Sequence, residues 1–150
     1  MDETENTSNG THGRLMALDV GSRTIGLAVT DPLGITAQGL QTIRRKNKRT
    51  DLAALQDVIT KYDVRELVIG LPLRMSGAEG TQSGKIREFA EMVEKHFKLP
   101  VHLWDERLTS VEANRVLRES EMSISKRAAV VDQLAAVLIL QNYLESRQHQ

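Results

Sequence analysis

The sequence predicts an α/β protein with a mixed β-sheet, because two different arrangements of short apolar segments follow one another along its 150 residues. Residues 14–43 hold three extended segments joined by short turns, the pattern of an antiparallel meander. Residues 50–104 alternate helical and extended patterns, which is typical of β-α-β units with parallel strands. A sheet built from both parts is antiparallel on one side and parallel on the other.

The first extended pair carries an acid at its tip. Apolar residues 15–18 end at Asp19, and the chain turns through Gly21, Ser22 and Arg23 into a second apolar run at 25–29. Aspartate is a poor strand former, so an aspartate that ends a buried strand needs a ligand, a cap or a cation to satisfy it. Glycine in the turn allows close approach of another backbone or of a phosphate.

A turn at residues 32–34 leads into the third extended segment, 35–43, and then into a basic run, RRKNKR, at 44–49. Such a run is either a solvated loop or a patch that contacts phosphates, and the sequence leaves both open. Thr50 or Asp51 is then expected to cap a helix that ends near Tyr62, because apolar residues recur there at helical spacing.

The second half alternates strands and helices. Residues 66–71, ELVIGL, have the continuous apolar character of a strand covered on both faces. The glycine-rich stretch 72–84 is expected to be a functional or mobile loop, and residues 85–97 an amphipathic helix. A last strand at 101–104 follows Pro100 and ends in Asp105, Glu106 and Arg107.

The C-terminal part is expected to be helical. A short helix is predicted at 111–117, a polar connection at 119–127, and a final helix at 128–146. This final helix is apolar as far as Leu140 except for Asp132. A carboxylate in such surroundings needs a cation or hydrogen-bond donors to offset a desolvation cost of several kcal/mol.

Composition limits the class of protein. Hydrophobic residues make up 40% and charged residues 27%, and 20 basic residues balance 20 acidic ones, so net charge does not favour nucleic-acid binding. The chain has no cysteine, which agrees with a reducing cytoplasm. Residues 1–13 are polar and lack the apolar region of a signal peptide, so we expect a disordered tail before a single domain at 14–150. No apolar run approaches the roughly 20 residues of a membrane span, and we expect a cytoplasmic protein without membrane contact.

Acids end or interrupt apolar elements at three places: at Asp19, at the pair 105–106, and at Asp132. Each has an ordinary explanation, because acids cap helices and favour the helix N-terminus. If the elements converge, the carboxylates repel one another unless a divalent cation lies between them. The four histidines do not cluster, so carboxylate oxygens favour Mg²⁺ or Mn²⁺ over zinc. Such a site suits hydrolysis of phosphodiester bonds.

Four segments also carry a family resemblance: LDVGSRTIGLAVTD, VIGLPLRMSGAEG, WDERLTS and VVDQLAAVLILQNYL, in this order. Together they resemble the YqgF family, also called RuvX, which consists of ribonuclease H-like proteins described as pre-16S rRNA nucleases or Holliday junction resolvase homologues. The resemblance covers residues 14–144. It implies a ribonuclease H-like fold, with a five-stranded mixed sheet in the order 3-2-1-4-5, helices on both faces, and a carboxylate-bound metal at the centre.

The resemblance assigns catalytic and metal-binding roles to Asp19, Glu106 and Asp132. In related resolvases the second acid ends the fourth strand, where this chain has Gly-Leu-Pro at 70–72, so the last strand has to supply it. Asp105 is a possible ligand, but alternation puts Asp105 and Glu106 on opposite faces, and we favour Glu106 because it lies further past the strand end. The candidates for substrate contact are Gly21, Ser22, Arg23, Gly77, Gly80, Arg107, Lys126 and Arg127.

The activity implied is Mg²⁺- or Mn²⁺-dependent hydrolysis of structured RNA, with processing of the 5′ end of precursor 16S rRNA as its biological role. Ribosomal precursor particles are then possible partners. Two alternatives stay open: a Holliday junction resolvase acting on branched DNA, and a non-catalytic nucleic-acid-binding module. The sequence is compatible with a monomer or a homodimer.

Overall fold

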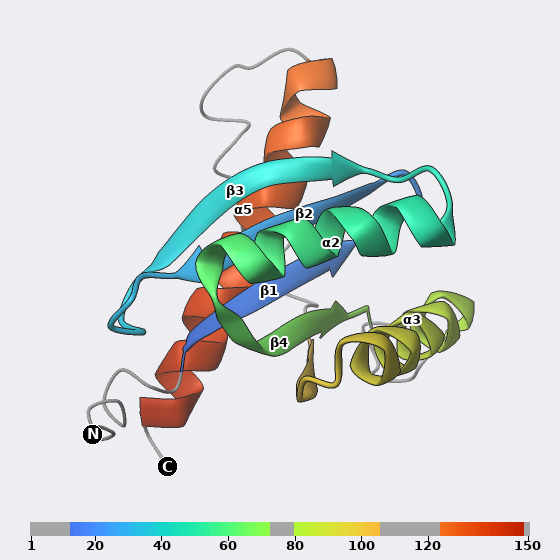
Figure 1. Cartoon of the computed structure of the whole chain (residues 1–150). Helices are drawn as coiled ribbons and strands as arrows, with labels where there is room; N and C mark the ends of the chain where they lie inside the picture. Colours follow the sequence, from blue (N-terminus) through green and yellow to red (C-terminus); the bar gives the residue numbers. More distant parts are fainter. Residues whose placement is uncertain (1–12, 73–79, 106–123, 149–150) are drawn as a thin grey trace.

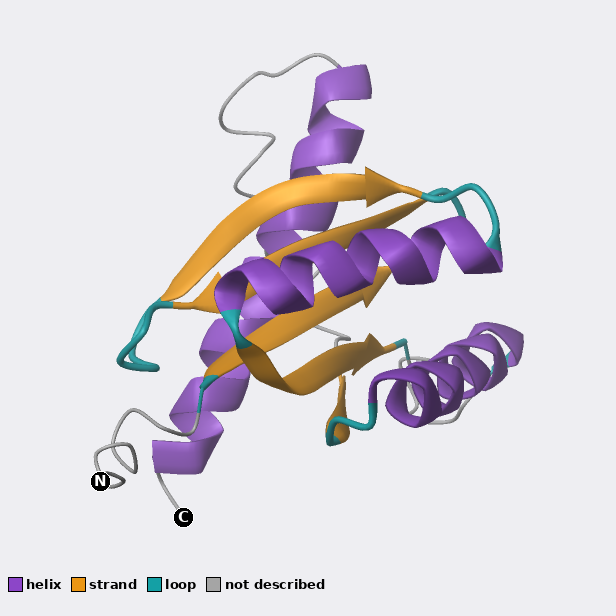
Figure 2. Ribbon diagram, viewed as in Figure 1, coloured by secondary structure: helices purple, strands orange, loops and turns teal. Residues whose placement is uncertain are grey.

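In the computed structural model, which describes residues 13–72, 80–105 and 124–148, helices flank one mixed sheet (Figures 1 and 2). The five strands lie in the order β3-β2-β1-β4-β5, as the resemblance implied. In chain order the elements are β1 (Arg14–Val20), β2 (Thr24–Thr30), β3 (Ala37–Arg44), α2 (Lys48–Tyr62), β4 (Val64–Leu71), α3 (Thr81–Phe97), β5 (Val101–Asp105) and α5 (Ile124–Gln148).

Strand pairing confirms the predicted division of the sheet. β1 pairs antiparallel with β2, and β2 pairs antiparallel with β3, which gives the meander. On its other side β1 pairs parallel with β4, and β4 pairs parallel with β5. The carboxyl ends of β1, β4 and β5 therefore share one edge of the sheet, with β4 between the other two.

Helices cover both faces of the sheet. Figure 1 shows α2 and α3 in front of it and α5 behind it. Side chains of β1 alternate between the two cores: Met16 and Leu18 belong to the cluster under α2 and α3, whereas Leu15 and Ala17 belong to the cluster under α5. Because β1 is buried on both faces, its sequence is a continuous apolar run up to Asp19.

The predicted cap of α2 was wrong. The helix begins at Lys48, and Asn47 is the N-cap: its backbone is extended and its side-chain oxygen accepts a hydrogen bond of 2.9 Å from the amide of Thr50. Asp51 instead lies in the first turn, where it is buried and engaged by the preceding basic segment. The basic run therefore ends inside the helix.

Two other helices begin earlier than predicted. α3 starts at Thr81, inside the stretch expected to be a loop, because the hydroxyl of fully buried Ser83 donates to the carbonyl of Pro72 and fixes the first turn. α5 starts at Ile124, within the stretch expected to be polar connection. Figure 1 shows this first part of α5 extending past β3, where no sheet lies against it and no apolar pattern is required.

The tail at residues 1–12 and the short helix predicted at 111–117 lie outside the described residues. Within the described part of the chain, no helix has the length and apolar character of a membrane span.

Candidate functional site

Asp19 lies at the shared carboxyl edge of the sheet, one residue before the end of the central strand. It is half-buried and pairs with Gly26 on β2. On the other side, the register that pairs Leu18 with Ile69 places Asp19 beside Gly70 of β4. Both cross-strand neighbours of Asp19 are therefore glycines, which add no side chain beside this carboxylate.

The face of the sheet that Asp19 occupies follows from alternation along β1. Ala17 packs against α5, while Leu18 and Val20 pack under α2 and α3. The side chain of Asp19 therefore faces the same way as Ala17, toward α5. This is the side on which a second acid has to lie if the two are to bind one ion.

Asp105 is on the opposite side. Trp104 contacts Tyr143 of α5 with ring centroids 5.7 Å apart, and Leu103 packs against the core under α2 and α3. Asp105 follows Leu103 by two residues and is exposed, so alternation directs it away from the side of Asp19. The next position, Glu106, lies outside the described residues.

Asp132 lies in α5 itself, and its side chain is outside what the structure describes. Its neighbours fix how this part of the helix sits: Ala136 and Ile139 are fully buried against the sheet. Gln133 donates a hydrogen bond of 2.7 Å to the carbonyl of Leu40 and covers Gly39, where an added Cβ would lie 2.9 Å from its Cγ. α5 thus crosses β3, β2 and β1 with Asp132 one helical turn before Ala136.

The predicted three-acid cluster lies partly outside the described residues. Among the residues that the structure describes, no three His, Asp or Glu side chains are placed to hold one metal ion. Two of the predicted ligands, Glu106 and the side chain of Asp132, are outside that set. Asp19 and its two flanking glycines are the described part of the candidate centre.

Some of the predicted substrate contacts lie in the described part of the chain, near the turn after β1 and at the start of α3, and the others do not. Ser22 and Arg23 are exposed in the turn between β1 and β2, which closes with a 2.8 Å hydrogen bond from the amide of Gly21 to the carbonyl of Thr24. Gly80 is the N-cap residue of α3 and makes no side-chain cap. Gly77 and Arg107 lie outside the described residues. Lys126 and Arg127 lie in the first turns of α5, where the structure describes the backbone but not these side chains.

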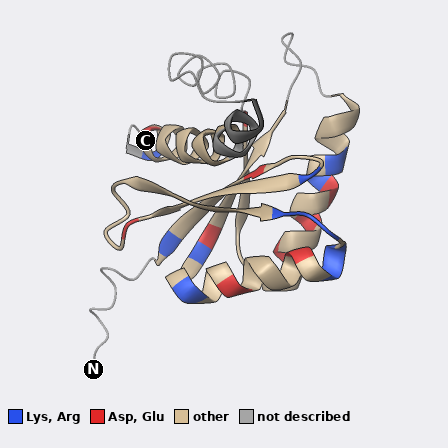
Figure 3. Cartoon of the chain, turned by 90° about the horizontal axis from the view of Figure 1, so that it is seen from above, with Lys and Arg blue, Asp and Glu red and all other residues tan. Residues whose placement is uncertain are grey.

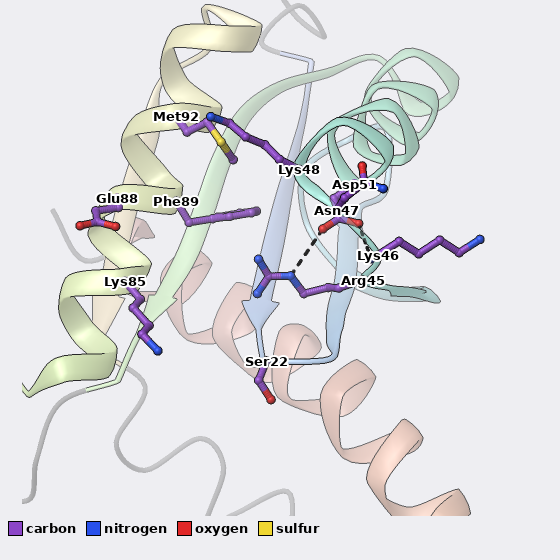
Figure 4. A pocket seen from close by; sticks show the side chains of 10 residues that line it. All are labelled: Ser22, Arg45, Lys46, Asn47, Lys48, Asp51, Lys85, Glu88, Phe89 and Met92. Carbon is purple, nitrogen blue, oxygen red and sulfur yellow. Dashed lines mark hydrogen bonds and ion pairs between the residues drawn. The ribbon is translucent and has the colours of Figure 1, made fainter.

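Arg45 fixes the turn next to Asp19, and sequence reasoning missed this role. Its guanidinium donates to the carbonyl of Gly21 at 2.6 Å and lies 3.6 Å from the carboxylate of Asp51. Its backbone amide donates to the carbonyl of Arg23 at 2.8 Å, and its guanidinium lies over the ring of Phe89 at 5.4 Å. One side chain of the basic run therefore ties the turn after Asp19 to both α2 and α3 (Figure 4).

The rest of the basic run gathers on the surface at the same place. Figure 3 shows a continuous stretch of Lys and Arg where β3 passes into α2. The sequence left open whether this run is a loop or a phosphate patch; Arg45 is structural, while Lys46, Lys48 and Arg49 are exposed. The only sequence signal for the distinction is Asp51, the acid that Arg45 neutralises.

A second polar cluster stabilises the α5 face away from the candidate centre. His102 lies on the same face of β5 as Trp104, and its Nε2 is 2.5 Å from the carboxylate of Glu66. Arg147 of α5 reaches the same carboxylate at 3.3 Å. Burial, and next the negative charge of Glu66, raise the pKa of Tyr143, which packs on His102. The cluster attaches the end of α5 to β4 and β5.

Comparison with known proteins identifies a family and several relatives of this chain. A family model described as "RuvX: Holliday junction resolvase" matches residues 13–146. A protein of Koribacter versatilis is 70% identical over 91% of this chain and 89% of its own length, and one of Moorella thermoacetica is 54% identical over 88% and 94%. Both carry the name "Putative pre-16S rRNA nuclease".

Solved structures share the fold at low sequence identity. RuvC of T. thermophilus, in complex with a Holliday junction substrate, aligns with a TM-score of 0.52 and 14% identity over 91% of this chain and 96% of its own. The Fowlpox virus resolvase in complex with Holliday junction DNA aligns with a TM-score of 0.56 and 12% identity over 89% and 98%. The fold is that of RuvC-like, ribonuclease H-type resolvases, and the match of the family model over residues 13–146 shows that this chain belongs to the RuvX family.

Proposed function

We propose that this protein is a metal-dependent nuclease that hydrolyses phosphodiester bonds of structured RNA and processes the 5′ end of precursor 16S rRNA. The observation that carries the proposal is the setting of Asp19: an acid at the end of the central strand, flanked by Gly26 and Gly70, on the face covered by α5. The names of the two relatives above support the substrate.

The donor set fits Mg²⁺ or Mn²⁺. Asp19, Glu106 and Asp132 would hold the ion, and all three offer only carboxylate oxygens, the ligands that these ions prefer. Helical spacing favours Asp132, because it precedes buried Ala136 by four residues and residues four apart share a helix face. Alternation favours Glu106 over Asp105 in the same way.

The chemistry divides between the ion and the chain. When bound, the ion supplies Lewis-acid activation of water and of the phosphoryl oxygen. The chain would position the substrate: the two glycines beside Asp19 add no side chain next to its carboxylate, and the turn held by Arg45 keeps Ser22 and Arg23 close to Asp19 along the chain. A rigid support of this kind keeps the reacting groups in place.

The experiment compares the wild type with Asp19→Asn on a labelled precursor 16S rRNA fragment, with Mg²⁺, Mn²⁺ or chelator. We expect the wild type to cut only with a divalent ion, and Asp19→Asn to lose at least about a hundredfold in cleavage rate while it still binds the RNA. Asp57→Asn, the same change at an exposed position of α2, is the matched control and should cleave at the wild-type rate. Equal cleavage by Asp19→Asn would refute the assignment.

Resolution of Holliday junctions is the second candidate, favoured by the description of the matching family model. The same proteins are therefore assayed on a labelled four-way DNA junction. Faster cleavage of the junction than of the RNA would transfer the proposal to DNA with the same centre. Binding of either substrate without cleavage in any divalent ion would favour a non-catalytic nucleic-acid-binding module.

A further inference from the structure

A groove lies between the N-terminal halves of α2 and α3, on the face of the sheet opposite α5. It has a volume of about 630 Å³ and opens beside Ser22, at the turn that follows Asp19. Four cationic and two acidic side chains line it, for a net charge of +2. Its lining residues are Ser22, Arg45, Lys46, Asn47, Lys48, Asp51, Lys85, Glu88, Phe89 and Met92, drawn in Figure 4.

The two acids do not cancel the positive charge inside the groove. Asp51 is buried and already engaged by Arg45 and by the amide of Lys46 at 2.9 Å. Figure 4 shows the carboxylate of Glu88 directed away from Arg45. The potential in the space between the helices is therefore positive, and low-dielectric walls of Phe89 and Met92 focus it.

Lys46 is directed away from α3 in Figure 4, so Lys48 and Lys85 carry the charge that a ligand in the groove can reach. Lys48 extends from the first turn of α2 across to Met92 of α3, and Lys85 projects from α3 beside the groove (Figure 4). Within residues 13–72, 80–105 and 124–148, neither lysine takes part in an ion pair, and both are exposed. Their charges are available to an anion from solution.

The chemistry of the groove favours phosphate over base recognition. Phe89, its aromatic residue, is only 8% exposed and is covered by the guanidinium of Arg45, so no ring is open for a base to stack on. Lysines are flexible point charges that bind phosphate without reading sequence. A polyanionic strand is the ligand that such a groove accepts.

We propose that this groove binds backbone phosphates of the substrate strand to one side of the cleaved bond. The proposal rests on the nuclease function above and extends it with a second contact surface. Asp19 faces α5 and the groove lies between α2 and α3 on the other face of the sheet, and both adjoin the turn at Gly21, Ser22 and Arg23. A strand bound over this exposed turn would lie between the candidate centre on one side and the groove on the other.

The test is the salt dependence of RNA binding by the double variant Lys48→Gln/Lys85→Gln. Binding of a fluorescent precursor 16S rRNA fragment is measured by anisotropy in chelator at a series of KCl concentrations. Each phosphate contact on a single strand contributes about 0.7 to the slope of log K against log salt. We expect the slope to fall by about 1.4 and affinity at 0.1 M salt to fall by about 25-fold.

The matched control removes two lysines from the other ends of the same helices. Lys61→Gln lies in the last turn of α2, and Lys98→Asn lies at the C-cap of α3, where asparagine tolerates the left-handed backbone (φ 58°). This control should keep both slope and affinity. Lys48→Arg/Lys85→Arg keeps the charges and should retain the slope, which separates charge from folding defects.

The outcomes separate the two proposals. If the groove variant keeps the slope and affinity of the control, the groove proposal is overturned, whether or not the protein cleaves RNA. If the wild type binds but cleaves neither substrate, the nuclease proposal fails while the slopes still decide the groove. If the wild type binds no RNA and no branched DNA, both are overturned.

Discussion

The contact between Arg45 and Asp51 tests whether burial or distance determines the strength of an ion pair in this protein. The side chain of Asp51 is 5% exposed and that of Arg45 is 30% exposed, and Arg45 Nε lies 3.6 Å from Asp51 Oδ2. Arg65 and Asp63 form a shorter pair, 2.9 Å, but their side chains are 60% and 69% exposed. The Arg45–Asp51 pair is therefore the more buried of the two, whereas the Arg65–Asp63 pair is the shorter.

The magnitude follows from what each change removes. At an effective dielectric constant near 20, the Coulomb energy of two charges 3.6 Å apart is about 5 kcal/mol, and desolvation offsets much of it. Arg45→Met also removes the 2.6 Å hydrogen bond to Gly21 and the cation–π contact with Phe89, while Asp51 keeps its bond from the amide of Lys46. We expect the free energy of unfolding to fall by about 2–3 kcal/mol in Arg45→Met.

A double-mutant cycle isolates the pair. Arg45→Met, Asp51→Asn and the double variant are unfolded with urea, and we expect a coupling energy of about 1–2 kcal/mol. The parallel cycle with Arg65→Met and Asp63→Asn should give less than about 0.5 kcal/mol, because solvent screens an exposed pair. Amide hydrogen exchange in the turn at residues 21–24 should speed up only in the Arg45 variants.

Equal coupling energies in the two cycles, or a larger one for Arg65 and Asp63, would refute the argument from burial. A large loss of stability in Arg45→Met with no coupling to Asp51 would instead assign the effect to the contacts with Gly21 and Phe89.

Three further predictions concern the site, the α5 face and the core. Glu106→Gln should abolish metal-dependent cleavage of the RNA fragment, whereas Asp105→Asn should retain it, because Asp105 alternates onto the other face; the reverse result would exchange their roles. Because the pKa of Tyr143 is raised, the folded state keeps its proton while the unfolded state loses it, so its contribution to stability is complete below pH 10.0 and is lost as pH rises further. Absorbance titration of Tyr62→Phe, which leaves Tyr143 as the remaining one of two tyrosines, checks this; a midpoint at or below 10.0 would contradict it. Ile139→Ala, at a fully buried position under α5, should cost about 2–5 kcal/mol in urea unfolding, and a loss below 1 kcal/mol would mean that the contact of α5 with the sheet is loose.

Much of the fold followed from local patterns. Short turns between the first three apolar runs require antiparallel neighbours, and the helices between the later runs require parallel ones, so the division of the sheet was predictable. The starts of α2 and α3 were not predictable, because Asn47 competes with Thr50 and Asp51 as a cap, and Ser83 stabilises its turn through a carbonyl eleven residues earlier, whereas both helices end where the sequence predicted. Such boundaries depend on partners outside the segment.

The candidate site also has a part that the sequence predicted and a part that depended on the tertiary structure. The sequence alone identified Asp19 as an acid that needs a partner, because an aspartate after a buried apolar run is costly in any fold. Only the tertiary structure decided that two glycines flank it, that Asp105 is directed to the other face, and that Arg45 is engaged by Asp51 while Lys48 is exposed. The physical reason is that the cost of placing an acid in an apolar segment can be read from a few neighbouring residues. Register, strand order and the partner of a charge are instead set by segments that meet only after folding.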